Sequence, residues 1–210
     1  MKENLISKII QSMALWVMAR TAYSVYTKLD GSEKLKYKIL QKNENYELRE
    51  YNPYIIAQVT IPNAWDVSWD AFRILWWYIF GNNKSKKNIS MTSPVITKSE
   101  KLGMVSPVLT KTDNDIYTMS FVMPSDCDID ELPIPNDNRI TFQKIESYKS
   151  AIYWFSWYTN DQKVKKITQR LKYSLDNDNI KYFDEAILMR YDPPFIVPFL
   201  MQNEILLKIK

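Results

Sequence analysis

Three residue types are scarce or absent in this chain of 210 residues: there is no histidine, one cysteine and only three glycines. Average usage would give about 15 glycines, and phosphate-binding loops and dinucleotide fingerprints need several of them close together. Both nucleotide-binding classes are therefore excluded. The absence of histidine excludes Ser-His and Cys-His nucleophile pairs and the usual zinc sites.

The lone cysteine, Cys127, cannot form an internal disulfide, and without histidine it cannot complete a cysteine-type metal site. It lies in the acidic segment Asp126-Cys127-Asp128-Ile129-Asp130, which lacks the glycine and the closing glutamate of a calcium-binding loop. We interpret this segment as a solvated acidic turn and predict no metal site.

Most of the chain also lacks an excess of charge of either sign. Residues 1–36 hold six basic and three acidic side chains, whereas the remainder holds 22 basic and 21 acidic side chains. A body this close to neutral has no electrostatic footprint for phosphate backbones. We therefore expect no nucleic-acid partner.

A long hydrophobic run is absent too, although the amino-terminal segment is apolar. Ile9–Ala19 has 11 residues without a charge, which is shorter than the roughly 18 to 20 that a membrane-spanning helix needs. One reading is a signal peptide, with Lys2 and Lys8 ahead of the apolar centre and Val17-Met18-Ala19 as its cleavage site. The other is an uncleaved amphipathic helix that lies on a membrane surface or packs on its own domain. A polar face through its first half favours the helix, which predicts a cytoplasmic or membrane-associated protein.

What is present from residue 37 onward is a pattern that occurs twice. In the first half we predict strands at 46–51 and 54–61, a helix from the cap Asn63 to Phe80, and strands at 89–97 and 116–123. In the second half we predict strands at 139–146 and 151–158, a helix over 160–176 capped by Thr159 with Gln162, and strands at 186–191 and 204–210. The order β-β-α-β-β, repeated, predicts an α+β fold. The proline-rich segment Pro124–Asn138 reads as a crossover loop within one domain, 37–210, which follows an amino-terminal helix and linker, 1–36.

The first predicted helix is unusually apolar, because 12 of the 16 residues from Trp65 to Phe80 are apolar and four of these are tryptophan. One face holds Val67, Ala71, Ile74, Leu75 and Tyr78, and another holds Trp65, Trp69, Phe72, Trp76 and Phe80. A sheet buries only one face of a helix. The second face must therefore meet the amino-terminal helix, another chain, a membrane or a flat apolar ligand.

Several of these segments, taken together, resemble the SOUL haem-binding family. They are Tyr46-Glu47-Leu48-Arg49-Glu50-Tyr51, Ala71-Phe72-Arg73-Ile74-Leu75, Tyr78-Ile79-Phe80-Gly81-Asn82, Met91-Thr92-Ser93-Pro94-Val95, Met119-Ser120-Phe121-Val122-Met123-Pro124-Ser125, Leu132-Pro133-Ile134-Pro135, Tyr191-Asp192-Pro193-Pro194 and Asn203-Glu204-Ile205. They occur in family order across residues 37–210.

The resemblance implies a duplicated α+β unit whose strands form a distorted barrel-like antiparallel sheet with two main helices outside. It implies kinship with bacterial multidrug-sensing effector domains, whose paired repeats bind apolar ligands in a central groove. The activity that it implies is non-catalytic binding of haem or another tetrapyrrole. It gives no oligomeric state.

Carried onto this chain, the resemblance places the haem-facing positions at Trp69, Phe72, Trp76 and Trp77, with Phe195, Ile196 and Val197 as an opposite wall. Some family members are thought to bind iron through histidine, which this chain lacks. Others hold the macrocycle mainly by apolar contacts along the first helix, and that mode remains available here. Arg73, Lys84, Lys86 and Lys87 could donate to haem propionates. Met201-Gln202 replaces two arginines that family members often carry, and Trp157 stands where the family often has glycine.

Three other readings remain open at this stage. The groove between the repeats could hold a different apolar small molecule. The aromatic helix face could serve a membrane or protein partner. An enzyme would need an acid or base other than histidine, for which Glu50 and Glu204 are the nominated carboxylates. Hydrogen-bonded structural carboxylates are the simpler interpretation, so we expect no catalysis. Cys127 could offer a thiolate to iron, but it lacks the Cys-Pro sequence of haem-responsive motifs.

Overall fold

The computed structural model describes residues 33–62, 66–85, 102, 105–113, 116–192 and 196–210. The predicted amino-terminal helix, the cap Asn63 and the predicted strand at 89–97 lie outside the described residues. Among those residues, neither helix is long and apolar enough to cross a bilayer.

The first half of the chain contains seven described strands and one helix. They are β1 (Glu33–Lys34), β2 (Tyr37–Lys42), β3 (Glu47–Tyr51), β4 (Tyr54–Pro62), α2 (Val67–Ile79), β5 (Asn83–Lys84), β6 (Val105–Asp113) and β7 (Ile116–Val122). The strands predicted at 46–51, 54–61 and 116–123 are confirmed as β3, β4 and β7. The strands β1, β2, β5 and β6 were not predicted.

The second half follows the predicted order closely. It contains β8 (Ile134–Pro135), β9 (Ile140–Ile145), β10 (Tyr148–Phe155), α3 (Asp161–Asn177), β11 (Tyr182–Arg190), the 3₁₀ turn η1 (Pro198–Leu200) and β12 (Asn203–Ile209). Strand β10 begins three residues before its predicted start. The segment from Pro124 to Asn138 forms turns and the two-residue β8, which agrees with a connecting loop.

Nine strands form one continuous path in the order β2-β3-β10-β12-β11-β6-β7-β4-β9, and β1 pairs with β6 outside this path. All pairings on the path are antiparallel, whereas β1 runs parallel to β6. The fold is therefore α+β, as predicted. The sheet curves strongly, but β2 and β9 remain its two edges, so the barrel suggested by the resemblance is not closed.

Four strands of each half pair in a corresponding order. Strand β4 pairs with β7 and β9, and its counterpart β10 pairs with β12 and β3, while β6 and β11 pair with each other at the centre. That the halves superpose as structural repeats stays a prediction.

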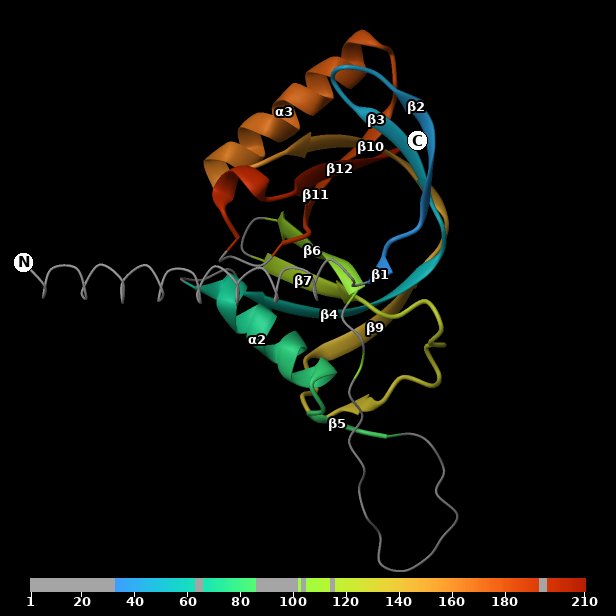
Figure 1. Ribbon diagram of the computed structural model, residues 1–210, viewed down its shortest axis with the longest axis vertical. Helices are drawn as coiled ribbons and strands as arrows, with labels where there is room; N and C mark the ends of the chain where they lie inside the picture. Colours follow the sequence, from blue (N-terminus) through green and yellow to red (C-terminus); the bar gives the residue numbers. More distant parts are fainter. Residues whose placement is uncertain (1–32, 63–65, 86–101, 103–104, 114–115, 193–195) are drawn as a thin grey trace, which may run out of the picture.

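Alternation along the strands sends side chains to two faces of the curved sheet. The inner face holds a cluster that includes Tyr51, Ile56, Ile152, Met189 and Leu206. On the outer face, α2 covers β4 and β7, and α3 covers β10, β11 and β12 (Figure 1). The two helices therefore cover different parts of the outer face, and the central strand β6 lies between the strands that they cover.

The ends of the helices follow local rules. Helix α2 ends where Asn82 N–H donates to Trp77 O and Gly81 N–H donates to Tyr78 O, with Gly81 at φ 107°, the arrangement that favours glycine after a helix. Helix α3 is capped by Asn160, whose side chain accepts from Lys163 N–H at 2.8 Å. The prediction that Thr159 caps this helix was wrong by one residue.

Candidate ligand site

Four aromatic rings form a continuous stack along one side of α2, which we call the aromatic ladder: Trp69, Phe72, Trp76 and Phe80. Successive ring centroids are 5.8, 5.4 and 4.3 Å apart, and the ring planes are tilted by only 15° to 26°. The spacing of three or four residues brings side chains together on one side of a helix. Two of the rings are substantially exposed, Trp69 at 55% and Phe80 at 47%.

The ladder is held by the core beneath it. Phe72 and Trp76 are partly buried against the cluster under α2, and the edge of Phe72 meets Phe121 of β7 with centroids 5.5 Å apart. The helix face made of Ala71, Ile74, Leu75 and Tyr78 is buried, as predicted. The ladder is thus an apolar surface on a fixed support.

The structure separates the remaining predicted residues of α2 from the ladder. Trp77 is rotated by about 100° from Trp76 around the helix, and it is exposed. Arg73 is exposed and its Nη2 contacts Asp70 Oδ1 at 2.9 Å. Phe80, by contrast, completes the stack although it was absent from the predicted site. Its place on the predicted aromatic face was the signal that could have included it.

The predicted opposite wall is only partly described. Ile196 is buried and Val197 is exposed, while Phe195 lies outside the described residues. Of the lysines predicted for propionates, Lys84 is exposed, and Lys86 and Lys87 lie outside the described residues.

A cavity of about 1090 Å³ lies between the two helices on the outer face of the sheet. Its described lining comes from the first turn of α2, the outer faces of β6, β7 and β11, and the first turns of α3. We call this cavity the interhelical groove. Volumes of this size hold small molecules. Among the described residues, those predicted for the site do not line it.

One polar atom in the interhelical groove lacks a partner. Tyr117 lines the groove and is buried, and its hydroxyl has no hydrogen-bond partner. A buried hydroxyl without a hydrogen-bond partner is costly. The sequence showed only a tyrosine within a predicted strand, which gives no sign of a missing hydrogen-bond partner.

The aromatic ladder and the interhelical groove lie over the same strands. Phe121, which Phe72 contacts, pairs with Val108 of β6. Thr110 and Thr112, which line the groove, follow on the same face of β6, and the segment from Val108 to Thr112 is roughly 13 Å long.

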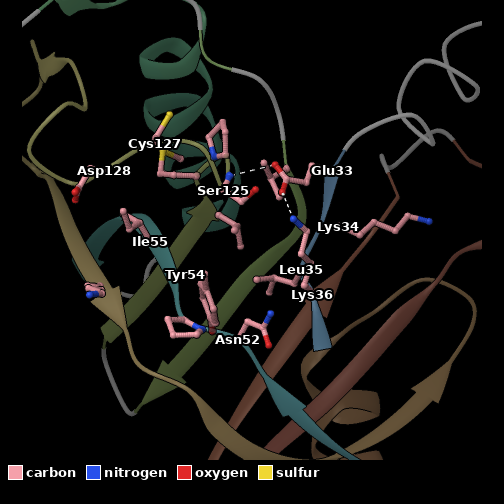
Figure 2. Close-up of a pocket in the computed structure, with 16 residues that line it drawn as sticks. Glu33, Lys34, Leu35, Lys36, Asn52, Tyr54, Ile55, Ser125, Cys127 and Asp128 are labelled. Carbon is pink, nitrogen blue, oxygen red and sulfur yellow. Dashed lines mark hydrogen bonds and ion pairs between the residues drawn. The ribbon is translucent and has the colours of Figure 1, made fainter. Parts of the chain in front are cut away.

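A second, smaller cavity of about 450 Å³ contains Cys127 (Figure 2). It lies between the segment around β1 and the loop that follows β7, where Glu33 accepts from Ser125 N–H at 3.2 Å. This hydrogen bond, together with Lys36, lowers the pKa of Glu33 despite an opposing contribution from burial. The cavity is separate from α2, because its described lining includes none of that helix.

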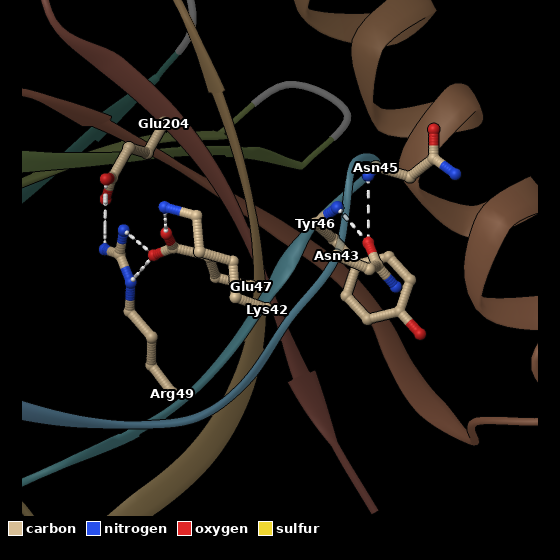
Figure 3. A network of polar contacts seen from close by, with 7 residues as sticks. All are labelled: Lys42, Asn43, Asn45, Tyr46, Glu47, Arg49 and Glu204. Atoms are coloured by element: carbon tan, nitrogen blue, oxygen red, sulfur yellow. Dashed lines mark hydrogen bonds and ion pairs between the residues drawn. The ribbon is translucent and has the colours of Figure 1, made fainter.

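The nominated carboxylate Glu204 belongs to a buried network on the inner face of the sheet. Arg49 and Glu204 are each 5% exposed. Arg49 Nη1 contacts Glu204 at 3.0 Å, Arg49 Nη2 contacts Glu47 at 2.6 Å, and Glu47 also pairs with Lys42 (Figure 3). Tyr191 donates its hydroxyl to Glu204 at 2.7 Å. Glu50 points to the opposite face, since it neighbours Arg49 on β3, so the two nominated carboxylates do not converge.

Burial and neighbouring charges shift the pKa values of Arg49 and Tyr191 within this network. Burial alone would lower the pKa of Arg49, but the charge of Glu204 together with Tyr51 and Glu47 outweighs it, and the pKa of Arg49 is raised. Burial and the charge of Glu204 raise the pKa of Tyr191. The network therefore holds a fixed ion pair and neutral tyrosines.

Comparison with known families decides the family of the chain. The family model described as "SOUL heme-binding protein" matches residues 32–208. The chain belongs to the SOUL haem-binding protein family. "Heme-binding protein 1" of Xenopus laevis is 27% identical over 187 residues, which is 84% of this chain and 92% of the relative.

Solved structures share the fold of this SOUL protein at low identity. A hydrolase from Listeria innocua has a TM-score of 0.54 at 11% identity, covering 90% of this chain and 98% of its own. The EcmrR C-terminal domain has a TM-score of 0.55 at 11% identity, covering 84% and 99%. At this identity the likeness shows the fold alone.

The aromatic residues of this SOUL protein fit a tetrapyrrole, whereas the absence of histidine excludes one kind of iron ligand. The ladder provides stacked rings for a flat macrocycle. With no histidine in the sequence, an imidazole cannot be the axial ligand of haem iron.

Proposed function

We propose that this SOUL protein binds haem or a related tetrapyrrole non-covalently on the aromatic ladder of α2, without a histidine ligand to iron. The observation that carries this proposal is the stack Trp69-Phe72-Trp76-Phe80, supported from below and exposed at both ends. Family membership supplies the class of ligand.

Apolar contact supplies enough free energy for moderate affinity. An aromatic side chain buries roughly 150 to 250 Å² when it is fully covered. At about 25 cal/mol per Å², the uncovered parts of four rings contribute several kcal/mol before association costs of similar size are subtracted. We expect micromolar affinity, with the iron adding little.

Arg73 is the described cation on α2 that could meet a propionate. Its pair with Asp70 is exposed on both sides and therefore contributes little to stability. A propionate that approaches α2 can replace Asp70 as the partner of Arg73 at small cost.

We propose binding rather than catalysis. Glu204 has its carboxylate engaged by Arg49 and Tyr191, and Glu50 lies on the opposite face of the sheet. Two carboxylates that do not converge cannot share general acid and base roles on one substrate.

The proposal is tested by titrating haem into variants of the ladder and of exposed tryptophans elsewhere. Phe72→Ala with Trp76→Ala removes the centre of the stack, so haem affinity should fall by about tenfold or more. Trp77→Ala should weaken binding less than Trp76→Ala. Trp154→Ala is the matched control, because Trp154 is as exposed as Trp77 but lies on β10. Unchanged affinity in the Phe72/Trp76 variant, or equal loss in the Trp154 variant, would contradict the proposal.

A second candidate is a small molecule in the interhelical groove, which has a largely polar lining and lies beside the unpartnered Tyr117 hydroxyl. We infer that the two β-β-α-β-β halves are structural repeats, because their pairing corresponds, and this groove lies between them. If the ligand occupies the groove, Tyr117→Phe should weaken its binding. The same substitution should stabilise the ligand-free protein, because it removes a buried hydroxyl without a hydrogen-bond partner. If the ligand occupies the ladder, Tyr117→Phe should leave affinity unchanged.

A further inference from the structure

Five large apolar side chains gather on two adjacent loops beside the start of α3. We call them the apolar loop patch: Trp157, Tyr158, Val197, Phe199 and Leu200. Each is between 48% and 64% exposed. The loops adjoin because β10 and β12 pair up to Phe155 and Asn203, and beyond this pair Trp157 N–H donates to Pro198 O at 2.8 Å. Together their exposed surfaces amount to roughly a few hundred Å², which is the size of apolar patch that marks interaction sites.

The backbone holds the patch outward. Ile196 and Met201, which flank the second loop, are buried, so the apolar residues between them are presented from two anchored ends. Trp157 adopts φ 84°, a left-handed conformation that is unfavourable for a large side chain. Asn203 stabilises this conformation by donating from Nδ2 to Trp157 O at 3.0 Å. Such strain persists where surrounding structure enforces it, and it is typical of functional positions.

Positive charge borders the patch. Lys163 Nζ donates to the carbonyls of Ser156 and Tyr158 at 2.8 and 3.2 Å. Helix α3, which starts here, carries five basic and two acidic residues, and in its early turns Lys165, Lys166 and Asp161 are exposed. Beside the second loop, the carboxylate of Asp192 adds a negative charge and accepts from Gln202 N–H at 2.6 Å.

We propose that the apolar loop patch is a docking site for the surface of an anionic lipid bilayer. Tryptophan and tyrosine favour the membrane interface, where an apolar ring meets water at its polar edge. Phenylalanine, leucine and valine on short loops can enter the acyl boundary, and neighbouring lysines are attracted to anionic headgroups. A protein partner explains the apolar side chains equally well, but it gives no reason for the basic helix beside them.

The test is flotation of the full chain with vesicles of phosphatidylcholine, with and without phosphatidylserine. The wild type should bind the phosphatidylserine vesicles, and high salt should weaken this binding. Phe199→Ser with Leu200→Ser should lower the partition coefficient by about tenfold. Tyr173→Ser is the matched control, because Tyr173 is an exposed aromatic residue of α3 roughly 18 Å along the helix from its start, and it should bind as the wild type does.

A second variant guards against misfolding. Trp157→Gly removes the ring but suits the backbone, since glycine adopts positive φ without penalty. It should keep the wild-type circular dichroism spectrum and bind vesicles more weakly. Binding unchanged in both patch variants, or no binding by the wild type, overturns the proposal. A wild-type dimer that becomes monomeric in the Phe199/Leu200 variant also overturns it, because the patch would then be a protein interface.

Discussion

Single residues decide how the inner face of the sheet is built. Arg49 and Glu204 are 155 positions apart in sequence, yet they form a buried pair that Tyr191 and Glu47 extend. Tyr37 adds a ring 4.2 Å from the guanidinium of Arg49. Removing one member of such a pair leaves a buried charge without compensation, which costs far more than the pair contributes as a whole.

We therefore predict that Arg49→Met destabilises the protein by about 3 to 5 kcal/mol. Glu204→Met should do the same, while the double variant should lose much less than the sum of the two. Urea unfolding of all four proteins measures this coupling. Additive losses would mean that the two side chains do not interact as the structure places them.

At the scale of elements, the two helices differ in what their outer sides can do. Helix α3 buries only Leu171 and Leu175 fully and exposes a basic surface, whereas α2 buries five residues and still carries the ladder. Helix α3 depends on its cap as well, because its amino-terminal N–H groups need acceptors.

Substitution of that cap is a direct test of the boundary of α3. Asn160→Ala removes the acceptor of Lys163 N–H and should cost about 1 kcal/mol of unfolding free energy. Thr159→Ala should cost less, since Thr159 Oγ1 accepts only from Arg190 at 3.3 Å. Thermal unfolding compares the two variants. A larger loss of stability for Thr159→Ala would show that Thr159 caps the helix, as predicted from sequence.

The sequence predicts elements well where local pattern decides them. The β-branched run in β4 and the apolar stripe of α3 gave elements within a few residues of those observed. Strand β6 was missed because Pro107 interrupts it, and a proline argues against a central strand. The structure accommodates Pro107 where the β6 and β7 register shifts between Val105 and Val108.

The candidate site was predictable in part for the same reason. Helical spacing placed Trp69, Phe72 and Trp76 on one face, and the structure stacks them. The pairing of Arg49 with Glu204, the position of Tyr117 beside a groove and the union of the two apolar loops depend on contacts between distant segments. No local pattern carries this information.

At the scale of the whole molecule, several carboxylates are more acidic in the fold than in water. Hydrogen bonds and neighbouring cations lower the pKa of Glu33 and Asp137. For Glu47, burial would raise the pKa, but Lys42 and Arg49 outweigh it, and its pKa falls below the usual 4.5. A lowered pKa in the folded state adds stability above the unfolded pKa, and this stability is lost as pH falls through the folded pKa.

The protein should therefore be less stable near pH 3 than near pH 7, with the decline beginning as pH falls below about 5. Glu47→Gln removes one contributing group and should make the decline shallower. Urea midpoints measured across this range for both proteins provide the check. An equally steep decline in the variant would show that Glu47 does not contribute.

We propose that aromatic packing, and not an iron bond, holds the tetrapyrrole. Parallel spectral titrations with haem and with metal-free protoporphyrin test it most directly. We predict micromolar binding of both, with affinities within about tenfold, a difference of at most roughly 1.4 kcal/mol. Cys127→Ser should leave both affinities and the haem spectrum unchanged. Much tighter binding of haem that Cys127→Ser abolishes, or no micromolar binding of either macrocycle, would contradict the account.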